Sequence, residues 1–387
     1  MNEDNKMTTA VVGCGAISDI YLTNMMSRFS GLKVVACCSG HMENARKKAE
    51  KYNIRACTYE EILADPEIGL IVNLTPAPAH YGIIRRALLA GKHVYTEKTI
   101  TVGLEEAQEL LRLADENGLY LCSAPDTFLG AALQTARRAI DEGLIGEVTS
   151  CMASANRDLN ILASVCSFLR MPGGGICYDY GVYYMTALVS LLGPVEKVAG
   201  TARNPYPRRR FVVPDTPDYG KDMDYPNETQ VSAMLQFESG VTGTLHLNGD
   251  SNLVDHTGFL IYGTKGILKL ANPNNFGGQV TLIPNCADHR NPPAPQVLDY
   301  GLDYADNCRG IGPAEMVQAV REGRRARTDK ELAYHVLEVL CGIMESSEKE
   351  EFVRIKSTCS RPQPFEGFLK SKEEEAEACC RVRSEQQ

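Results

Sequence analysis

One short stretch near the start of the chain constrains its fold more than any other, namely Val11-Val12-Gly13-Cys14-Gly15-Ala16-Ile17-Ser18. Apolar residues precede it and a helical pattern follows it, which predicts a strand, a tight turn and a helix start. Gly13 lets the backbone turn sharply. Gly15 lets a pyrophosphate approach the helix N-terminus, where free N–H groups and the helix dipole favour negative charge. The third position of the pattern is Ser18 rather than glycine or alanine. The alternative is a glycine turn between any strand and helix, so the rest of the chain must supply the context.

Strands and helices alternate from this turn to about residue 124. Further strands are predicted at residues 32–38, 69–74, 93–96 and 119–122, each separated from the next by a helical pattern. This alternation predicts a doubly wound parallel α/β sheet. Because ligands of such sheets bind beyond the carboxyl ends of the strands, the residues that follow each strand are candidates for a binding site.

The residues at these strand ends form a predicted dinucleotide-binding set. Their convergence at one sheet edge favours a bound cofactor over an unrelated glycine turn. For His80, which follows a Pro-rich break, an ordinary helix-start role is the alternative. The cofactor-binding set consists of Gly13, Gly15, Ala16, Ile17, Ser39, Thr75, Pro76, His80, Glu97 and Lys98.

The end of the second predicted strand bears on the choice of cofactor. In dinucleotide folds an acidic residue about 20 positions past the glycines holds the adenosine ribose 2′-OH. Here Ser39 stands at that strand end, and the basic run 46–48 follows it. A hydroxyl near bases suits a 2′-phosphate, which favours NADP over NAD. The alternative is that the basic run is a solvated helix face.

After residue 124 the pattern changes to that of an α+β domain. A helix is predicted at residues 129–142, and alternating apolar residues then predict a large, mostly antiparallel, open-faced sheet. Helices would cover one face of this sheet. A second subunit would cover the other face, which predicts a homodimer or homotetramer. The strands are expected at residues 147–153, 195–203, 229–238, 241–248, 257–262, 266–270 and 279–283.

A helix is also predicted at residues 179–192, led by Gly173-Gly174-Gly175. It places Asp179 and Tyr183 on one face, because they lie four residues apart. Residues 205–226 are rich in proline and arginine and predict a loop. Closing helices are expected at residues 313–321 and 330–346.

Composition disfavours several classes of function. The chain has 387 residues and a formal net charge of −9, so bulk electrostatics do not favour a nucleic acid or an anionic membrane as partner. It has no run of about 18 apolar residues, and its first residues lack the apolar core of a signal peptide. Its 14 cysteines include no C-x-x-C pair, and no His, Cys or carboxylate cluster has metal-ligand spacing. These features predict a cytoplasmic protein with free thiols and no bound metal.

Three motifs together resemble those of a known family. In chain order they are Gly13-x-Gly15-x-x-Ser18, Glu97-Lys98 and Gly173-Gly174-Gly175-x-x-x-Asp179-x-Gly181-x-Tyr183. Their order and spacing are similar to those of the Gfo/Idh/MocA family, which includes glucose–fructose oxidoreductase and inositol dehydrogenase. The resemblance implies a dinucleotide-binding Rossmann domain over residues 1–125 and a substrate-binding and oligomerisation domain over 126–366. The charged C-terminal tail, residues 367–387, lies outside the part of the chain that the resemblance covers.

The resemblance also implies roles for individual residues. It implies bound NAD(P), with Lys98 beside the nicotinamide ribose and the reacting hydroxyl. It further implies that Asp179 positions the substrate and that Tyr183 stands where many members carry histidine. The strand end Ser39-Gly40 is similar to that of glucose–fructose oxidoreductase, an NADP protein. The family motif is Glu-Lys-Pro, and here Thr99 takes the place of the proline.

The same three side chains, Lys98, Asp179 and Tyr183, could together support hydride transfer from an alcohol. Hydride transfer from an alcohol requires a base within about 2.6–3.2 Å of the hydroxyl. The pKa of an ordinary tyrosine is near 10, so Tyr183 would need an ammonium such as that of Lys98 nearby to lower it. Lys98 could also stabilise the developing alkoxide, and Asp179 could anchor a neighbouring sugar hydroxyl. The alternatives are a core tyrosine for Tyr183 and a helix cap for Asp179.

The predicted function is NAD(P)-dependent hydride transfer to or from a hydroxyl of a sugar, glycoside or related polyol, with the sugar 3-position included. Two alternatives stay open. One is a glycoside-cleaving enzyme that works through a transient 3-keto sugar with tightly bound NAD(P). The other is a non-catalytic regulator that senses a sugar or dinucleotide on the same fold. Retention of Lys98, Asp179 and Tyr183 favours an enzyme of carbohydrate metabolism.

Overall fold

The computed structural model describes residues 6–254, 256–286, 288 and 290–365. They divide into two compact units. The first unit holds the described residues up to 126, together with 307–330 and 365, and the second holds 127–306 and 331–364. The charged tail expected over residues 367–387 lies outside the described residues.

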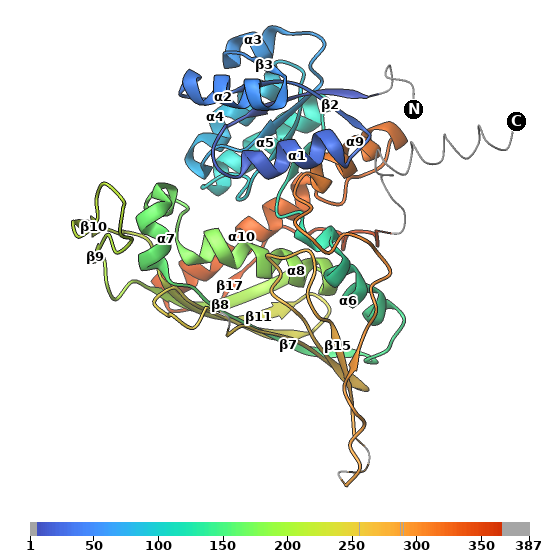
Figure 1. Ribbon diagram of the computed structural model, residues 1–387. Helices are drawn as coiled ribbons and strands as arrows, with labels where there is room; N and C mark the ends of the chain where they lie inside the picture. Colours follow the sequence, from blue (N-terminus) through green and yellow to red (C-terminus); the bar gives the residue numbers. More distant parts are fainter. Residues whose placement is uncertain (1–5, 255, 287, 289, 366–387) are drawn as a thin grey trace, which may run out of the picture. The chain divides into compact units, whose positions relative to one another are not determined.

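The first unit is built on a parallel sheet of six strands (Figure 1). Its elements up to residue 123 are β1 (Met7–Val12), α1 (Ser18–Ser27), β2 (Leu32–Cys38), α2 (Met42–Tyr52), β3 (Arg55–Ala56), α3 (Tyr59–Ala64), β4 (Leu70–Asn73), α4 (His80–Leu89), β5 (His93–Thr96), α5 (Leu104–Glu116) and β6 (Leu121–Ser123). The strand order is β3-β2-β1-β4-β5-β6, and every neighbouring pair is parallel. All four residues of β4 are buried, as expected for a central parallel strand with helices on both faces. The predicted doubly wound sheet is therefore confirmed. The edge strand β3 is missing from the sequence-based prediction, because two residues carry no periodicity.

The chain returns to the first unit after most of the second unit has been built. Helix α9 (Ile311–Glu322) belongs to the first unit, whereas the sequence pattern assigns residues 126–366 to one domain. Asp126 anchors the return, because its carboxylate accepts the backbone N–H groups of Gly310 and Gly312 at 3.3 and 3.1 Å. Asp126 is buried, and this burial raises its pKa to about 6. A sequence pattern does not reveal such a return, because its contacts join residues far apart along the chain.

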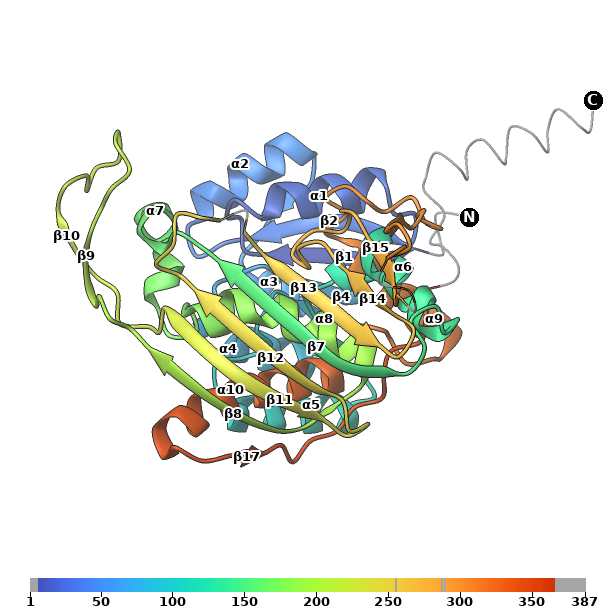
Figure 2. The ribbon, with the colours of Figure 1, turned by 90° about the horizontal axis from the view of Figure 1, so that it is seen from below.

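The second unit contains a sheet of nine strands (Figure 2). Its main elements are α6 (Ala131–Asp141), β7 (Val148–Asn156), α7 (Leu159–Val165), α8 (Val182–Leu192), β8 (Val195–Arg203), β11 (Gln230–Phe237), β12 (Thr242–Asn248), β13 (Gly258–Gly263), β14 (Gly266–Lys269), β15 (Thr281–Pro284), β16 (Gln296–Val297), α10 (Lys330–Lys349) and β17 (Val353–Arg354). The order is β16-β15-β14-β13-β7-β12-β11-β8-β17, and β7 with β12 is the parallel pair among antiparallel ones. The predicted large, mostly antiparallel sheet is confirmed.

Helices α8 and α10 cover one face of this sheet. A Cβ atom on Gly181, at the start of α8, would lie 2.8 Å from the Leu247 side chain of β12. A Cβ atom on Gly200 of β8 would lie 3.0 Å from Ile343 of α10. Helix and sheet backbones thus approach closely on this face. Figure 2 looks onto the opposite face, where the strands are in front of these helices.

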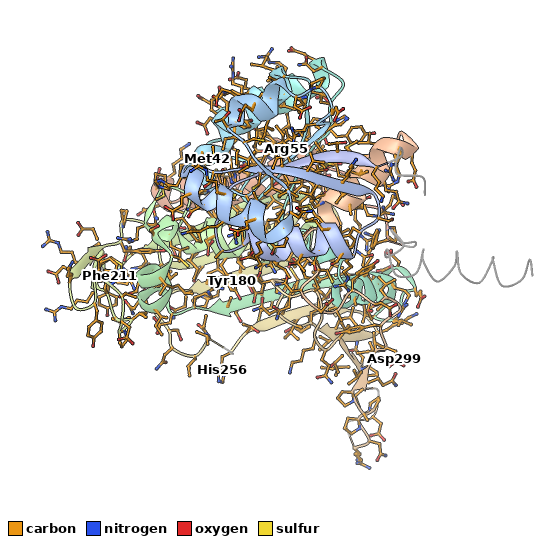
Figure 3. All side chains as sticks on the ribbon, turned by 45° about the horizontal axis from the view of Figure 1, so that its top comes forward. Met42, Arg55, Tyr180, Phe211, His256 and Asp299 are labelled. Carbon is orange, nitrogen blue, oxygen red and sulfur yellow. The ribbon has the colours of Figure 1, made fainter. Side chains whose placement is uncertain are left out.

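An arm projects from the second unit at residues 205–226. The sequence predicts a loop there, but the segment contains an antiparallel hairpin of β9 (Arg208–Arg210) and β10 (Asp222–Asp224). Figures 2 and 3 show the arm beside α7, and Figure 3 labels Phe211 on it. Arg209 points inward and pairs with Asp250 at 2.6 Å. The prediction fails because these three-residue strands are charged and lack apolar alternation.

Two findings concern the described residues as a whole. None of their helices combines the length and the apolarity needed to cross a membrane. Their cysteines form no disulfide bond, and most of these thiols are buried. Buried free cysteines act as small apolar side chains in packing.

Candidate active site

The turn between β1 and α1 uses its two glycines in different ways. Gly13 has a φ of +105°, and a Cβ atom there would lie 2.7 Å from the carbonyl carbon of Leu74. Only glycine fits this position. A Cβ atom on Gly15 would meet no atom of the chain within 4 Å. Ser18 is fully buried, and its hydroxyl donates to the Gly15 carbonyl at 2.6 Å. Serine at the third position therefore closes the turn, and the open approach at Gly15 fits the pyrophosphate of a dinucleotide.

The sheet brings four predicted positions to one edge. Gly13, Ser39, Thr75 and Glu97 follow β1, β2, β4 and β5, which are parallel neighbours in the sheet. The Glu97 N–H donates to the Asn73 carbonyl at 2.8 Å, which continues the strand pairing into the loop. The loops after these strands therefore lie side by side. The predicted residues exposed at this edge are Gly15, Ala16, Ile17 and Pro76.

Glu97 links the loop that carries Lys98 to helix α1 through hydrogen bonds. One carboxylate oxygen accepts the Tyr21 hydroxyl at 2.8 Å, and the other accepts the backbone N–H of Lys98 at 3.1 Å. The Lys98–Thr99 peptide bond is cis. Lys98 is partly exposed, whereas Tyr21 is fully buried. Glu97 thus orients the loop, and both Glu97 and Lys98 are partly exposed.

His80 joins the loops that follow β4 and β5. Its ring nitrogens lie 2.7 Å from the Thr75 carbonyl oxygen and 2.6 Å from the Thr99 carbonyl oxygen. Burial lowers the pKa of His80 below its usual value, while the two carbonyl groups oppose this effect. The side chain is completely buried. Any influence of His80 on a cofactor would therefore pass through the Thr75 and Lys98 loops.

The basic run on α2 has partners within the protein. Lys47 pairs with Glu43 at 2.7 Å, one turn away on the same helix. Lys48 pairs with Asp19 of α1 at 2.5 Å. These pairs support the interpretation of the run as a solvated face. Arg46 is exposed on α2.

The triple-glycine segment Gly173-Gly174-Gly175 leads into a helix of mixed geometry. A π-helical turn, Cys177–Gly181, carries Asp179, and α8 follows with Tyr183. The sequence pattern predicts one regular helix from Asp179 and misses the wider turn. Such turns are frequent at functional sites. Asp179 is partly exposed, and Tyr183 retains 8% of its surface exposed.

Two residues absent from the predicted site accompany Tyr183. The ring of Tyr180 packs edge-on against that of Tyr183, with centroids 6.1 Å apart. The Arg157 guanidinium lies 4.2 Å from the centroid of the Tyr180 ring, and Asn272 donates to the Tyr180 hydroxyl at 2.6 Å. A cation over an aromatic face is attractive, so Arg157 fixes Tyr180 and, through it, supports Tyr183. Tyr180 lies within the motif, but Arg157 lies in the loop between β7 and α7 and has no signature of its own.

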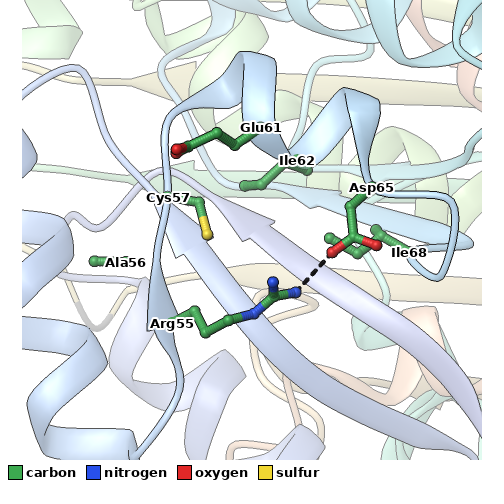
Figure 4. Close-up of a pocket in the computed structure, with 7 residues that line it drawn as sticks. All are labelled: Arg55, Ala56, Cys57, Glu61, Ile62, Asp65 and Ile68. Atoms are coloured by element: carbon green, nitrogen blue, oxygen red, sulfur yellow. Dashed lines mark hydrogen bonds and ion pairs between the residues drawn. The ribbon is translucent and has the colours of Figure 1, made fainter.

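A separate cavity of about 480 Å³ lies beside β3 and α3 (Figure 4). Arg55 and Asp65 form an ion pair at 2.7 Å across it. None of its lining residues belongs to the predicted cofactor or catalytic set, so we assign it no role in the chemistry. The lining consists of Arg55, Ala56, Cys57, Glu61, Ile62, Asp65 and Ile68.

Both halves of the chain match models of one family. Residues 7–124 match the oxidoreductase family with an NAD-binding Rossmann fold, and residues 133–269 match the GFO/IDH/MocA C-terminal domain. The chain therefore belongs to the Gfo/Idh/MocA family of oxidoreductases, and its first unit is an NAD-binding Rossmann domain. The family resemblance found in the sequence is confirmed.

Relatives and solved structures resemble the chain over most of its length. An uncharacterized oxidoreductase of Rhizobium meliloti is 28% identical over 356 residues, covering 88% of this chain and 96% of that protein. The trans-1,2-dihydrobenzene-1,2-diol dehydrogenase of Mus musculus is 26% identical over 344 residues, covering 88% and 95%. The structure of levoglucosan dehydrogenase with NADH and L-sorbose shares the fold, with a TM-score of 0.79, 18% identity and coverage of 91% of this chain and 99% of that chain. The protein is thus an oxidoreductase.

Proposed function

We propose that this oxidoreductase transfers a hydride between NAD(P) and a hydroxyl of a sugar, glycoside or related polyol, including the sugar 3-position. The observation that carries the proposal is the place of Lys98. It follows β5 at the sheet edge that also bears the Gly13–Gly15 turn. A cation at this edge can stabilise an oxygen that becomes negative as the hydride leaves. The sugar class is supported by levoglucosan dehydrogenase, whose solved complexes contain NADH with L-sorbose or levoglucosan.

The side chains of the second unit act on the substrate in this proposal. When bound, the nicotinamide supplies the hydride acceptor. Tyr183 takes the alcohol proton during oxidation, and Lys98 of the first unit favours the ionised form of the alcohol. Asp179 accepts a hydrogen bond from a neighbouring hydroxyl and so orients the sugar. Their proper alignment converts binding energy into rate.

We favour NADP over NAD. Ser39 stands where an acidic residue would repel a 2′-phosphate, and Arg46 is exposed on the following helix. A structure from Desulfitobacterium hafniense, for which NADPH dependence is proposed, shares the fold with a TM-score of 0.74 and 22% identity. Buried free thiols also fit the reducing cytoplasm.

Native mass spectrometry of the purified protein, followed by a glycoside panel, tests the proposal. We expect NADP(H) or NAD(H) to co-purify or to bind on addition, and at least one sugar or glycoside to reduce the bound cofactor. Release of an aglycone without net cofactor reduction would favour the glycoside-cleaving alternative. Cofactor binding with no turnover of any sugar would favour a sensor.

We also propose that the open face of the large sheet forms the interface of a homodimer or homotetramer. Met234 of β11 pairs with Thr244 of β12, which pairs with Met152 of β7. Met234 is 59% exposed and Met152 is 37% exposed on that face. Light scattering should give a mass above that of one chain, and Met234→Asp should lower it. A monomer at micromolar concentration would contradict this assembly.

A further inference from the structure

The carboxylate of Glu228 lies against the triple-glycine segment of the second unit. It accepts the backbone N–H of Cys177 at 2.9 Å, and the Glu228 carbonyl accepts that of Ile176 at 3.1 Å. A Cβ atom on Gly175 would lie only 2.0–2.1 Å from the atoms of this carboxyl group. The last glycine of the segment therefore leaves room for Glu228.

Residues 225–228, which we call the strut, hold the same segment at further points. The Tyr225 hydroxyl donates to the Gly174 carbonyl at 3.0 Å. The side-chain amide of Asn227 donates to the Leu169 carbonyl at 2.8 Å. The strut thus contacts the segment that leads into the helix through both the side chains and the backbone of residues 225–228.

The strut acts close to the candidate catalytic groups. Asp179 lies two residues beyond Cys177, and its N–H donates to the Gly175 carbonyl at 2.8 Å. Tyr183 follows Asp179 in the first turn of α8. The first N–H groups of a helix have no acceptor within the helix, and a carboxylate there is also favoured by the helix dipole. The Cys177 N–H is such a group, and Glu228 satisfies it.

We propose that Glu228 is a positioning residue for the reaction: by fixing residues 176 and 177 it sets where Asp179 and Tyr183 meet the substrate. This inference rests on the proposed function, because it assigns Glu228 to the same site. Glu228 itself need not touch substrate or cofactor. Its action on Asp179 passes through two residues of backbone.

The charge of Glu228 makes the inference testable. Removal from water raises the pKa of Glu228 to about 7, although the Cys177 N–H acts to lower it. Burial raises the pKa of Cys177, Tyr178 and Tyr225 above their usual values, and the charge of Glu228 adds a smaller rise. Glu228 is therefore expected to change charge within the range in which enzymes are assayed. The titratable and charged groups of this cluster are Cys177, Tyr178, Asp179, Arg209, Tyr225 and Cys341.

The raised pKa of Glu228 determines how its contribution to stability changes with pH. A carboxyl whose folded pKa exceeds its unfolded value stabilises the fold at low pH, and this contribution is lost as pH rises through about 7. Glutamine keeps an acceptor for the Cys177 N–H but does not titrate. Burial disfavours the charged form, so above pH 7 ionised Glu228 should hold the helix start less firmly than glutamine does, and below pH 7 the two side chains should behave alike.

The experiment compares Glu228→Gln with the matched control Glu338→Gln in the full-length protein. Glu338 is also buried and accepts two backbone N–H groups, from Lys356 and Ser357, but not from the helix start. The ratio of wild-type to E228Q kcat/KM should be near one at pH 5.5 and fall about 3- to 10-fold by pH 8.5, with a midpoint near 7. For E338Q the ratio should stay flat. Cofactor Kd should be unchanged in both variants.

Hydrogen exchange provides a measurement that needs no substrate. At pH 8.5, the peptide covering residues 174–183 should exchange faster in wild type and E338Q than in E228Q. This difference in exchange with a flat kcat/KM ratio would show that Glu228 affects the helix start without positioning the reaction, and would overturn the inference. Equal exchange in all three proteins would also overturn it. If wild type turns over no sugar, the proposed function fails, and the exchange comparison still supports or overturns the role of Glu228 at the helix start.

Discussion

The two glycine-rich segments of this protein use the same residue for opposite reasons. In the first unit, a Cβ atom on Gly15 would meet nothing within 4 Å. In the second unit, a Cβ atom on Gly174 would lie 2.5 Å from the Leu169 carbonyl oxygen, and one on Gly175 would collide with Glu228. Glycine at position 15 of the first segment keeps a surface open to a ligand, whereas Gly13 beside it is needed for the turn. Glycine in the second segment lets the protein pack against itself.

This difference indicates that the first segment serves ligand binding, whereas the second serves to position a helix. An open glycine turn at a helix N-terminus is suited to a phosphate, which approaches from solvent. A crowded glycine segment is suited to holding a helix in one place, because neighbouring backbone and carboxylate groups define its path. Substitutions in the two segments should therefore change different measured quantities.

The largest expected effect comes from removing one candidate reacting group from each unit, Lys98 from the first or Tyr183 from the second. Lys98→Ala should reduce turnover roughly 10²- to 10⁴-fold, because Lys98 stabilises an oxygen that is negative only in the transition state. Tyr183→Phe should cause a similar loss while keeping the shape and burial of the ring. Single-turnover absorbance of the reduced nicotinamide at saturating cofactor measures both. Cofactor Kd serves as the control and should change far less, and near-wild-type rates would show that another group carries the proton.

The next effect is on stability and concerns the crowded segment. Gly174→Ala places a methyl group against the backbone of residues 168 and 169, so overpacking should cost about 1–3 kcal/mol. Thermal unfolding should report this as a fall in Tm of several degrees. Cofactor Kd should be unaltered, since the dinucleotide turn belongs to the other unit. An unchanged Tm would mean that the segment has room to relax.

The matching substitution in the open segment should leave the Tm of the protein nearly unchanged. Gly15→Ala introduces a methyl group where the chain leaves space, so the Tm of the cofactor-free protein should stay within about a degree. The same methyl group stands in the path of the pyrophosphate and should weaken cofactor binding about tenfold, or ~1.4 kcal/mol. Fluorescence titration with NADPH and NADH measures the change. Unaltered affinity would place the pyrophosphate away from Gly15.

The smallest effect concerns cofactor choice. Arg46→Ala should weaken NADPH binding several-fold and leave NADH binding unchanged, because an exposed guanidinium contributes only modestly to a phosphate contact. Lys47→Ala is a suitable comparison, since Lys47 already pairs with Glu43. Tighter binding of NADH than NADPH by wild type, by tenfold, would reject the NADP preference.

Much of the fold could be predicted from the sequence because its signals are local. Apolar runs and glycine positions marked most strands of both sheets, and the alternation of strands with helices indicated the parallel sheet. The edge bearing Gly13, Ser39, Thr75 and Glu97 followed from that topology alone. Asp179 and Tyr183 could be singled out because a spacing of four residues places side chains on one helical face.

The tertiary structure decided the features that depend on distant contacts. Asp126 draws residues 310–312 back to the first unit, and His80 joins two loops through carbonyl groups of Thr75 and Thr99. Glu228 reaches Cys177, 51 positions earlier in the chain. None of these residues stands in a pattern of its own, because a hydrogen bond between remote segments imposes no periodicity on either one. Local sequence therefore determined which elements form, whereas long-range packing decided which side chains hold them in place.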